Sequence, residues 1–315
     1  MNKPSALSAT SLQPLSETSL QPLSEAKGNG EEGAEHKEQR ALGLKLQPAW
    51  STQFTPEALQ TLDPVRPIDN ISQDWAWEGS TGKGVKVAVI DSGIDAAHPA
   101  VGGPVSGYVA ISEGPGGMLY DTQPHEDVSG HGTACAGIIR SLAPDCELYS
   151  VKVLGAGLVG RGMVFAAGLR WAVENGMDAC NVSMGTTKKD FFAILHELAD
   201  QASFRNVMLV TAANNIPIPS FPSMYASVIS VASHEMKDPY AFFYNPNPPV
   251  EFGAPGIDVR VAWLNGEWIT ATGNSFAAPH ISGIVTRILG KHPHLTVFQM
   301  KVILRALSAN MPRGE

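Results

Sequence analysis

The alternation of apolar strands with amphipathic helices is the feature that most constrains the fold. Residues 85–90 form a nearly continuous, β-branched run, as expected of a strand covered on both faces. Residues 163–175 place Phe165, Leu169 and Val173 on one helical stripe. Further strands are expected at residues 147–154, 178–184, 207–213 and 228–232. Further helices are expected at residues 190–205, 275–289 and 296–307, and residues 102–124 are expected to be mostly loop. This alternation favours an α/β fold with a parallel sheet and right-handed crossovers.

The stretch GNSFAAPH at residues 273–280 opens an apolar helical run that ends near residue 289. Its glycine permits a sharp turn, and Pro279 is expected in the first helical turn, where a missing N–H costs little. Ser275 would then lie at a helix N-terminus, where free backbone N–H groups and the dipole favour negative charge. Such a serine is either an ordinary cap, which is the commoner case, or a nucleophile beside an oxyanion site.

Two further residues could assist such a nucleophile. Asp91 ends the strand of residues 85–91, at the edge of an open α/β sheet where ligands gather. His131, flanked by glycines in GHGT at residues 130–133, begins a helix rich in small residues. Each has a structural alternative, since Asp91 could be a turn residue and His131 a satisfied histidine near a helix cap. Either alternative alone is more common than catalysis, so the residues carry weight only in combination.

The blocks VAVIDSGID (residues 87–95), GHGT and GNSFAAPH occur in the order Asp, His, Ser. Together they resemble the three signature blocks of the subtilases, the subtilisin-like serine proteases, a known case of a convergent triad with this chain order. The resemblance extends from about residue 71 to about residue 311. It implies a doubly wound, mainly parallel β-sheet flanked by helices on both faces. It also implies a serine endopeptidase whose catalytic residues are Asp91, His131 and Ser275.

The resemblance further implies an oxyanion hole made by the backbone N–H of Ser275 and the side chain of Asn215. An asparagine after a strand is more often a turn residue, so Asn215 rests mainly on the match in register with the family. Asn214 stands where the family normally has glycine. Asn274 stands where the family often has a threonine that assists the oxyanion.

A peptide or protein substrate is expected to bind as an extended strand, because main-chain hydrogen bonds do not depend on its sequence. By resemblance, two segments would pair with it and a third would form the walls of the primary specificity pocket. The pairing residues would be Ser183, Met184 and Gly185 on one side and Gly155, Ala156, Gly157 and Leu158 on the other, and the pocket residues Ala212, Ala213 and Asn214. Any one of these glycines alone would be taken for a loop residue.

No cofactor and no metal site are expected. Extracellular subtilases bind calcium tightly through an aspartate after a His-Pro pair and through a loop inserted after the catalytic histidine. Here Ala100 follows His98-Pro99, and residues 138–144 continue without that loop. A hard cation needs about six to eight oxygen ligands, so no tight calcium is expected there, while weaker sites elsewhere stay open.

The first 65 residues are expected to be a low-complexity extension, disordered or a short propeptide, ahead of a catalytic domain over residues 66–315. Residues 11–18 and 19–26 repeat the polar sequence SLQPLSE, which buries too little apolar surface to offset the entropy of ordering. One hypothesis is that a segment within residues 44–67 covers the active site until it is cleaved. An inert linker is the alternative.

Composition excludes several function classes. A net charge of −8 argues against a nucleic-acid surface, and no run of about 18 apolar residues suits a membrane span. Three cysteines do not suggest a disulfide framework, and the N-terminus lacks the basic and apolar regions of a secretory signal. We therefore expect a cytoplasmic protein with no nucleic-acid or membrane partner; the sequence assigns no oligomeric state.

Three functions stay open at this level. The leading expectation is a serine endopeptidase, with the processing of a peptide precursor as one role. The second is a subtilase-like transpeptidase or macrocyclase of ribosomal peptides, although no segment between Asp91 and Ser275 is long enough for the capping insertion that such enzymes usually have. The third is a non-catalytic peptide-binding pseudoprotease, which an intact set of three residues disfavours.

Overall fold

The structure is a computed structural model that describes residues 51, 55–60 and 70–312. The chain divides into two units, Met1–Pro67 and Ile68–Glu315. In the first unit the described part includes a short helix, α2 (Pro56–Leu59), whose N-terminus is capped by the Thr55 side chain. The segment hypothesised to cover the active site lies mostly outside the described residues, so that idea stays a prediction.

The second unit is built on a nine-stranded sheet with the order β3-β2-β4-β1-β5-β6-β7-β9-β8. Neighbouring strands from β2 to β9 run parallel, and β3 and β8 pair antiparallel at the two edges. The strands are β1 (Lys86–Asp91), β2 (Gly107–Gly114), β3 (Gly117–Asp121), β4 (Glu147–Lys152), β5 (Ala179–Val182), β6 (Met208–Ala212), β7 (Ile229–His234), β8 (Phe243–Tyr244) and β9 (Phe252–Pro255). The predicted α/β fold with a mainly parallel sheet is confirmed.

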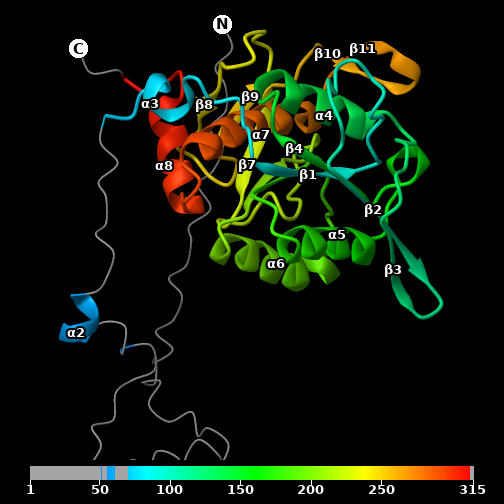
Figure 1. Cartoon of the computed structure of the whole chain (residues 1–315), viewed down its shortest axis with the longest axis horizontal. Coiled ribbons are helices and arrows are strands. Elements are labelled where there is room, and N and C mark those ends of the chain that lie inside the picture. The colour runs from blue at the N-terminus through cyan, green and yellow to red at the C-terminus, as the bar shows by residue number, and fades with distance from the viewer. Residues whose placement is uncertain (1–50, 52–54, 61–69, 313–315) are drawn as a thin grey trace, which may run out of the picture. The chain divides into compact units, whose positions relative to one another are not determined.

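Helices cover both faces of this sheet (Figure 1). They are α3 (Gln73–Trp77), α4 (His131–Leu142), α5 (Gly162–Glu174), α6 (Phe192–Phe204), α7 (Asn274–Lys291) and α8 (Val297–Leu307). Alternate residues of a strand point to opposite faces, so Val87 and Val89 join the core under α4 and α7 while Ala88 and Ile90 join the core under α5. No helix in the described part of the chain is both long and apolar enough to cross a membrane.

The main departure from the predicted elements lies between residues 102 and 124. The sequence predicts mostly loop here, but the stretch contains the antiparallel hairpin β2–β3, which protrudes from the sheet in Figure 1. Most of β3 is exposed, and its apolar residues Met118, Leu119 and Tyr120 are consecutive, so the strand lacks the alternation that would predict a half-buried strand. A second small sheet, β10 (Val259–Ala262) with β11 (Trp268–Ala271), is also not predicted by the sequence.

Candidate active site

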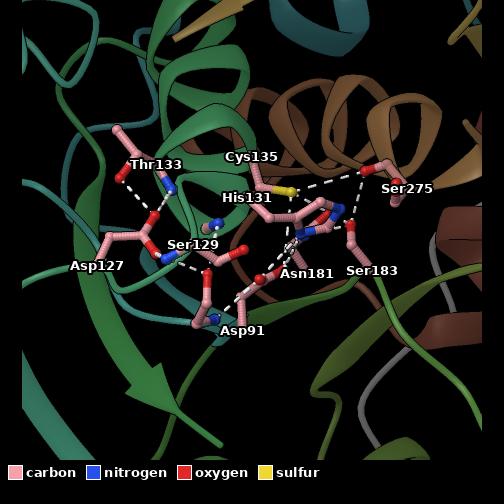
Figure 2. Close-up of polar contacts among 11 residues, drawn as sticks. Asp91, Asp127, Ser129, His131, Thr133, Cys135, Asn181, Ser183 and Ser275 are labelled. Atoms are coloured by element: carbon pink, nitrogen blue, oxygen red, sulfur yellow. Dashed lines mark hydrogen bonds and ion pairs between the residues drawn. The ribbon is translucent and has the colours of Figure 1, made fainter. Parts of the chain in front are cut away.

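Three segments that lie far apart in the sequence carry the predicted catalytic residues (Figure 2). Asp91 is the last residue of β1, His131 the first residue of α4 and Ser275 the second residue of α7. Carboxyl ends of parallel strands and the helix N-termini that follow them share one edge of an open sheet. The fold therefore gathers the three residues at this edge.

Asp91 and His131 form a buried hydrogen-bonded pair. His131 Nδ1 lies 2.9 Å from both carboxylate oxygens of Asp91, and the side chain of Asp91 is fully buried. Because Nδ1–H donates to the carboxylate, the neutral imidazole presents Nε2 as an acceptor. Burial disfavours the imidazolium, but the charge and hydrogen bond of Asp91, with the charge of Asp127, outweigh it and raise the pKa of His131 above its ordinary value.

A glycine lets the helix begin this close to the strand end. A Cβ placed on Gly132 would lie 2.0 Å from the carbonyl oxygen of Gly93 and 3.2 Å from Cβ of Asp91. No side chain fits into that space, so the approach of α4 to the end of β1 requires glycine at this position.

Asp127 is a second buried carboxylate next to the pair, and the sequence did not identify it as a functional residue. Its Oδ1 accepts from Ser92 Oγ–H at 2.7 Å and Ser129 N–H at 2.9 Å, and its Oδ2 accepts from Thr133 N–H at 2.8 Å and Oγ1–H at 2.7 Å. Ser92 Oγ in turn accepts from Gly132 N–H at 3.2 Å. Asp127 therefore joins the end of β1 to the first turn of α4 (Figure 2). An acidic residue just before a helix is a cap signal that could have pointed to it.

The position of Pro279 explains how Ser275 is held. Pro279 is the sixth residue of α7 and not a residue of its first turn, so that prediction was wrong. A proline there cannot donate to the carbonyl four residues earlier, which belongs to Ser275. That carbonyl accepts instead from Ser183 Oγ–H at 2.8 Å and from the thiol of Cys135 at 3.6 Å. The lost helical hydrogen bond is thus replaced by contacts that attach Ser275 to the residue after β5.

His131 and Ser275 line one cleft of about 560 Å³, together with Ser183, Met184 and Gly185. In this structure the two side chains are not directly hydrogen bonded to each other. The structure therefore brings Asp91 and His131 into contact and places Ser275 in the same cleft. Proton transfer from Ser275 to His131 stays a prediction.

Asn215 is oriented to act as a donor. Its Oδ1 accepts from the backbone N–H of Asn274 at 2.8 Å, which leaves Nδ2 as the free end of the amide. A Cβ placed on Gly273 would lie 3.3 Å from Ser275 Oγ and 3.6 Å from Asn215 Nδ2, so hydroxyl and amide flank the same small space. This arrangement fits the predicted oxyanion hole.

The residues expected to form the walls of the primary pocket lie around one pocket. A pocket of about 120 Å³ opens beside Ser275. Its lining residues are Ser183, Met184, Gly185, Ala212, Ala213, Asn214, Asn215, Ser220 and Ser275. The predicted wall residues and one predicted pairing segment are therefore brought together beside Ser275.

The second pairing segment is only partly in place. Of Gly155, Ala156, Gly157 and Leu158, only Leu158 lines the large cleft, whose wall continues through Gly160 and Arg161. Ala156–Leu158 forms a short 3-10 turn, with Gly157 at a φ of 71°, instead of an extended strand. Extended pairing through Ala156 and Gly157 is therefore wrong for this structure, because a helical turn does not present the alternating backbone groups of a strand, whereas Gly155 precedes the turn and has an extended backbone.

The structure offers one group of metal-ligand residues among those described, the buried set Asp91, His131 and Cys135, whose ligand atoms lie within 4.8 Å of one another. Burial, helped by the negative charge of Asp91, raises the pKa of the Cys135 thiol well above its ordinary value. The thiol therefore stays protonated, and its sulfur lies 3.4 Å from Ser183 Oγ. The Asp91–His131 contact in this set is a hydrogen bond that orients the imidazole. All three cysteines are free and buried.

Comparisons with known proteins agree with this geometry. The model of the subtilase family matches residues 82–311. The minor extracellular protease Epr of Bacillus subtilis (strain 168) is 33% identical over 253 residues, which cover 76% of this chain and 37% of that protein. Subtilisin E of the same strain is 32% identical over 239 residues, 71% of this chain and 60% of the relative. The subtilisin of Bacillus pumilus is 32% identical over 239 residues, 71% of this chain and 83% of the relative.

A solved structure shows the same fold. It is described as the crystal structure of a cold adapted subtilisin-like serine proteinase, with a TM-score of 0.59, 24% sequence identity and coverage of 72% of this chain and 83% of that one. This chain spans 37% and 60% of the lengths of the first two relatives named above, so their whole-protein properties do not transfer automatically. The match over residues 82–311 and the identity to the subtilisins nonetheless settle the relationship: the chain belongs to the subtilase family.

Proposed function

We propose that the chain is a serine endopeptidase that hydrolyses peptide bonds through an acyl-enzyme on Ser275. The observation that carries this proposal is the buried hydrogen bond between Asp91 and His131, together with the cleft that His131 and Ser275 both line. A serine hydroxyl is a weak nucleophile at neutral pH and needs such a base within reach.

In this mechanism Ser275 Oγ attacks the substrate carbonyl as His131 Nε2 takes its proton. Asp91 holds the imidazole in the tautomer that exposes Nε2, and its negative charge stabilises the imidazolium without receiving the proton. His131 then gives the proton to the leaving amine, and a water repeats the sequence to release the acyl group. The raised pKa of His131 keeps part of the base protonated under mildly acidic conditions, where activity should fall.

The oxyanion of the tetrahedral intermediate would receive two donors. One is the Ser275 N–H, which lies in the first turn of α7 where N–H groups lack helical partners. The other is Asn215 Nδ2, which the Asn274 N–H orients through the amide oxygen. In subtilisin the loss of the matching side chain lowers turnover by about 100- to 1000-fold.

The finer parts of the proposal concern substrate and setting. The substrate would lie extended along Ser183, Met184 and Gly185, with one side chain in the pocket of about 120 Å³. Processing of a peptide precursor in the cytoplasm is the role we propose. One relative is named extracellular, so cell fractionation with an antibody to the catalytic domain is the test of location.

We also propose that no tight calcium is held at the position used by extracellular relatives. The residues there do not fit the ion. His98 Nε2 lies 3.0 Å from the Glu267 carbonyl oxygen, its Nδ1 accepts from Ala100 N–H at 3.1 Å, and helix α4 is continuous from His131 to Leu142. An alanine and an occupied imidazole supply none of the carboxylate oxygens that calcium prefers. Equal thermal stability with calcium and with a chelator is the expected result.

A fluorophosphonate probe tests the central claim, because it labels only an activated serine. Intact mass should show one adduct on the full chain and none on Ser275→Ala, and internally quenched peptides should be cleaved only by the unaltered protein. Absence of labelling in folded protein would support the pseudoprotease alternative. Ligated products in the presence of an added amine, at the expense of hydrolysis, would support the transpeptidase alternative.

A further inference from the structure

The large cleft beyond the primary pocket carries charge of one sign. Its described lining residues include Arg161 and Lys188 and no aspartate or glutamate. The chain as a whole has a net charge of −8, so its acidic residues outnumber its basic ones. A cleft whose charged lining residues are all basic therefore differs from the average composition of the chain. A cleft lined by one sign of charge raises the local concentration of ligands of the opposite sign.

The two cations lie on opposite walls. Arg161 is on the loop between β4 and α5, and Lys188 is on the loop that follows β5. In the sheet β4 and β5 lie on either side of β1, the strand that ends in Asp91. A peptide that runs between these two loops therefore passes between two positive side chains.

The two charges are not equally available. Arg161 forms an ion pair with Glu113 of β2, in which the side chains are 73% and 41% exposed. Lys188 is exposed and has no ion-pair partner among the described residues. Lys188 should therefore contribute more to ligand charge preference, and Glu113 should weaken the contribution of Arg161.

The floor between the cations is apolar. It includes Leu154, Phe165, Met184 and Phe191, and the Phe191 ring packs on Gly162, where a Cβ would lie 2.3 Å from the ring. An apolar floor favours contact with the aliphatic part of a side chain, while the exposed cations at its rim attract a negative charge with the strength of a surface pair. A side chain with a short aliphatic stem and a carboxylate end matches this lining.

We infer that the preferred substrates carry an acidic residue on the N-terminal side of the cleaved bond. This residue would lie roughly two to four extended residues before the bond, and its side chain would lie between Arg161 and Lys188. The inference rests on the proposed peptidase function. The primary pocket next to Ser275 would take the residue whose carbonyl is attacked. The preceding residues would follow Ser183, Met184 and Gly185 towards Lys188.

The test uses three sets of internally quenched peptides that differ only in having Glu, Gln or Lys at one position before the cleaved bond. We expect kcat/KM in the order Glu, Gln, Lys at one or two of these positions at low salt, with a factor of about two to five per step, as for one exposed ion pair. The difference should shrink in about 0.5 M salt, since exposed charges are then screened.

Variants assign the effect to named residues. Lys188→Glu should invert the order of the three peptides, and Lys188→Ala should remove most of the preference. Lys189→Ala is the matched control, because Lys189 is the exposed neighbour that does not line the cleft, and it should leave the order unchanged. Glu113→Gln should strengthen the preference for Glu, because it frees Arg161 from its partner.

Binding to the full-length Ser275→Ala protein, measured by fluorescence anisotropy, separates this inference from the peptidase proposal. A tighter Kd for the Glu peptide supports the inference even if the unaltered protein hydrolyses nothing, which would overturn only the proposed function. Equal rates and equal Kd values for Glu and Gln peptides at every position would overturn the inference while leaving a hydrolysing enzyme intact. An unchanged order of the three peptides in Lys188→Glu would overturn it as well.

Discussion

Replacing Asp127 with asparagine tests whether this carboxylate joins β1 to α4. The two backbone donors, Ser129 N–H and Thr133 N–H, reach different oxygens of Asp127. An amide has only one oxygen, so one N–H loses its acceptor and faces an NH₂ group instead. An unsatisfied buried donor costs about 1–3 kcal/mol, and the remaining hydrogen bonds lose their ionic character. We expect Asp127→Asn to lower the free energy of unfolding by about 2–3 kcal/mol.

The pH dependence of this loss gives a second measure. Burial opposes the ionisation of Asp127, but hydrogen bonds from Ser129, Thr133 and Ser92 outweigh it and hold its pKa below the ordinary value of 3.8. A depressed pKa contributes stability that is fully present above the unfolded-state pKa and is lost as pH falls through the folded-state pKa. The difference between the original protein and Asp127→Asn should therefore be constant from about pH 5 to 8 and shrink below about pH 4.

Urea unfolding followed by tryptophan fluorescence measures both effects, in a Ser275→Ala background that prevents self-digestion. Asp145→Asn is the matched control, since Asp145 is exposed and its side chain makes no hydrogen bond among the described residues; it should change stability by less than about 0.5 kcal/mol. If Asp127→Asn unfolds at the same urea concentration as the control at pH 7, the hydrogen bonds to Asp127 do not join the two elements as argued.

Four further outcomes follow from the site. Asn215→Ala should lower kcat by about 100- to 1000-fold with little change in KM, because the donor acts on the oxyanion only in the transition state; an effect confined to KM would contradict this. In steady-state assays across about pH 5–9, the logarithm of kcat/KM should rise with pH through an apparent pKa above 6.5, the ordinary pKa of a histidine side chain, because the pKa of His131 is raised. The same assays should show that Asp91→Asn lowers kcat by roughly 10⁴-fold. Asn274→Ala should lower kcat/KM and broaden selectivity at the primary pocket in peptide-library profiling, because the Asn274 side chain bonds to the carbonyls of Ala213 and Asn214; unchanged selectivity would speak against a pocket role.

The elements that the sequence predicted well are those in which local pattern and tertiary role agree. The strand ending at Asp91 is buried along almost its whole length, so its apolar run reveals both its structure and its end. Helix α8 begins as predicted because Thr296 and Gln299 form a capping box, a signal contained in four residues. Such features need no knowledge of distant neighbours.

The features that the sequence missed depend on distant partners. The hairpin β2–β3 has an exposed strand with no apolar alternation, and its existence depends on pairing of β2 with β4. The turn at residues 156–158 replaces an expected extended segment, which glycine-rich sequence alone does not distinguish. Asp127 also bonds to its sequence neighbours Ser129 and Thr133, but its link to the end of β1 is made by Ser92, 35 residues away, and no local pattern contains that contact.

The two asparagines Asn274 and Asn215 act together, although only Asn274 departs from the family pattern. Asn274 Oδ1 accepts from Ser233 N–H at 2.9 Å, and its Nδ2 donates to the carbonyls of Ala213 at 3.2 Å and Asn214 at 2.9 Å. The amide of Asn274 is therefore fully used in joining the nucleophile loop to the ends of β6 and β7. It has no donor left for an oxyanion, unlike the hydroxyl that the family often has at this position.

In the proposed mechanism this leaves Asn215 and the Ser275 N–H as the oxyanion donors, and it changes what the loop contributes. The carbonyl of Ser275 is held by Ser183, its neighbour Asn274 by three backbone groups, and Asn215 by the Asn274 N–H. The two donors of the proposed mechanism are thus held before any substrate arrives, Asn215 by the Asn274 N–H and Ser275 through its carbonyl by Ser183. Donors fixed in advance need no reorganisation during the reaction, which is the condition under which they stabilise developing charge most. In the proposed mechanism, Asn274 therefore positions the two donors, Asn215 Nδ2 and the Ser275 N–H, and does not itself donate to the oxyanion.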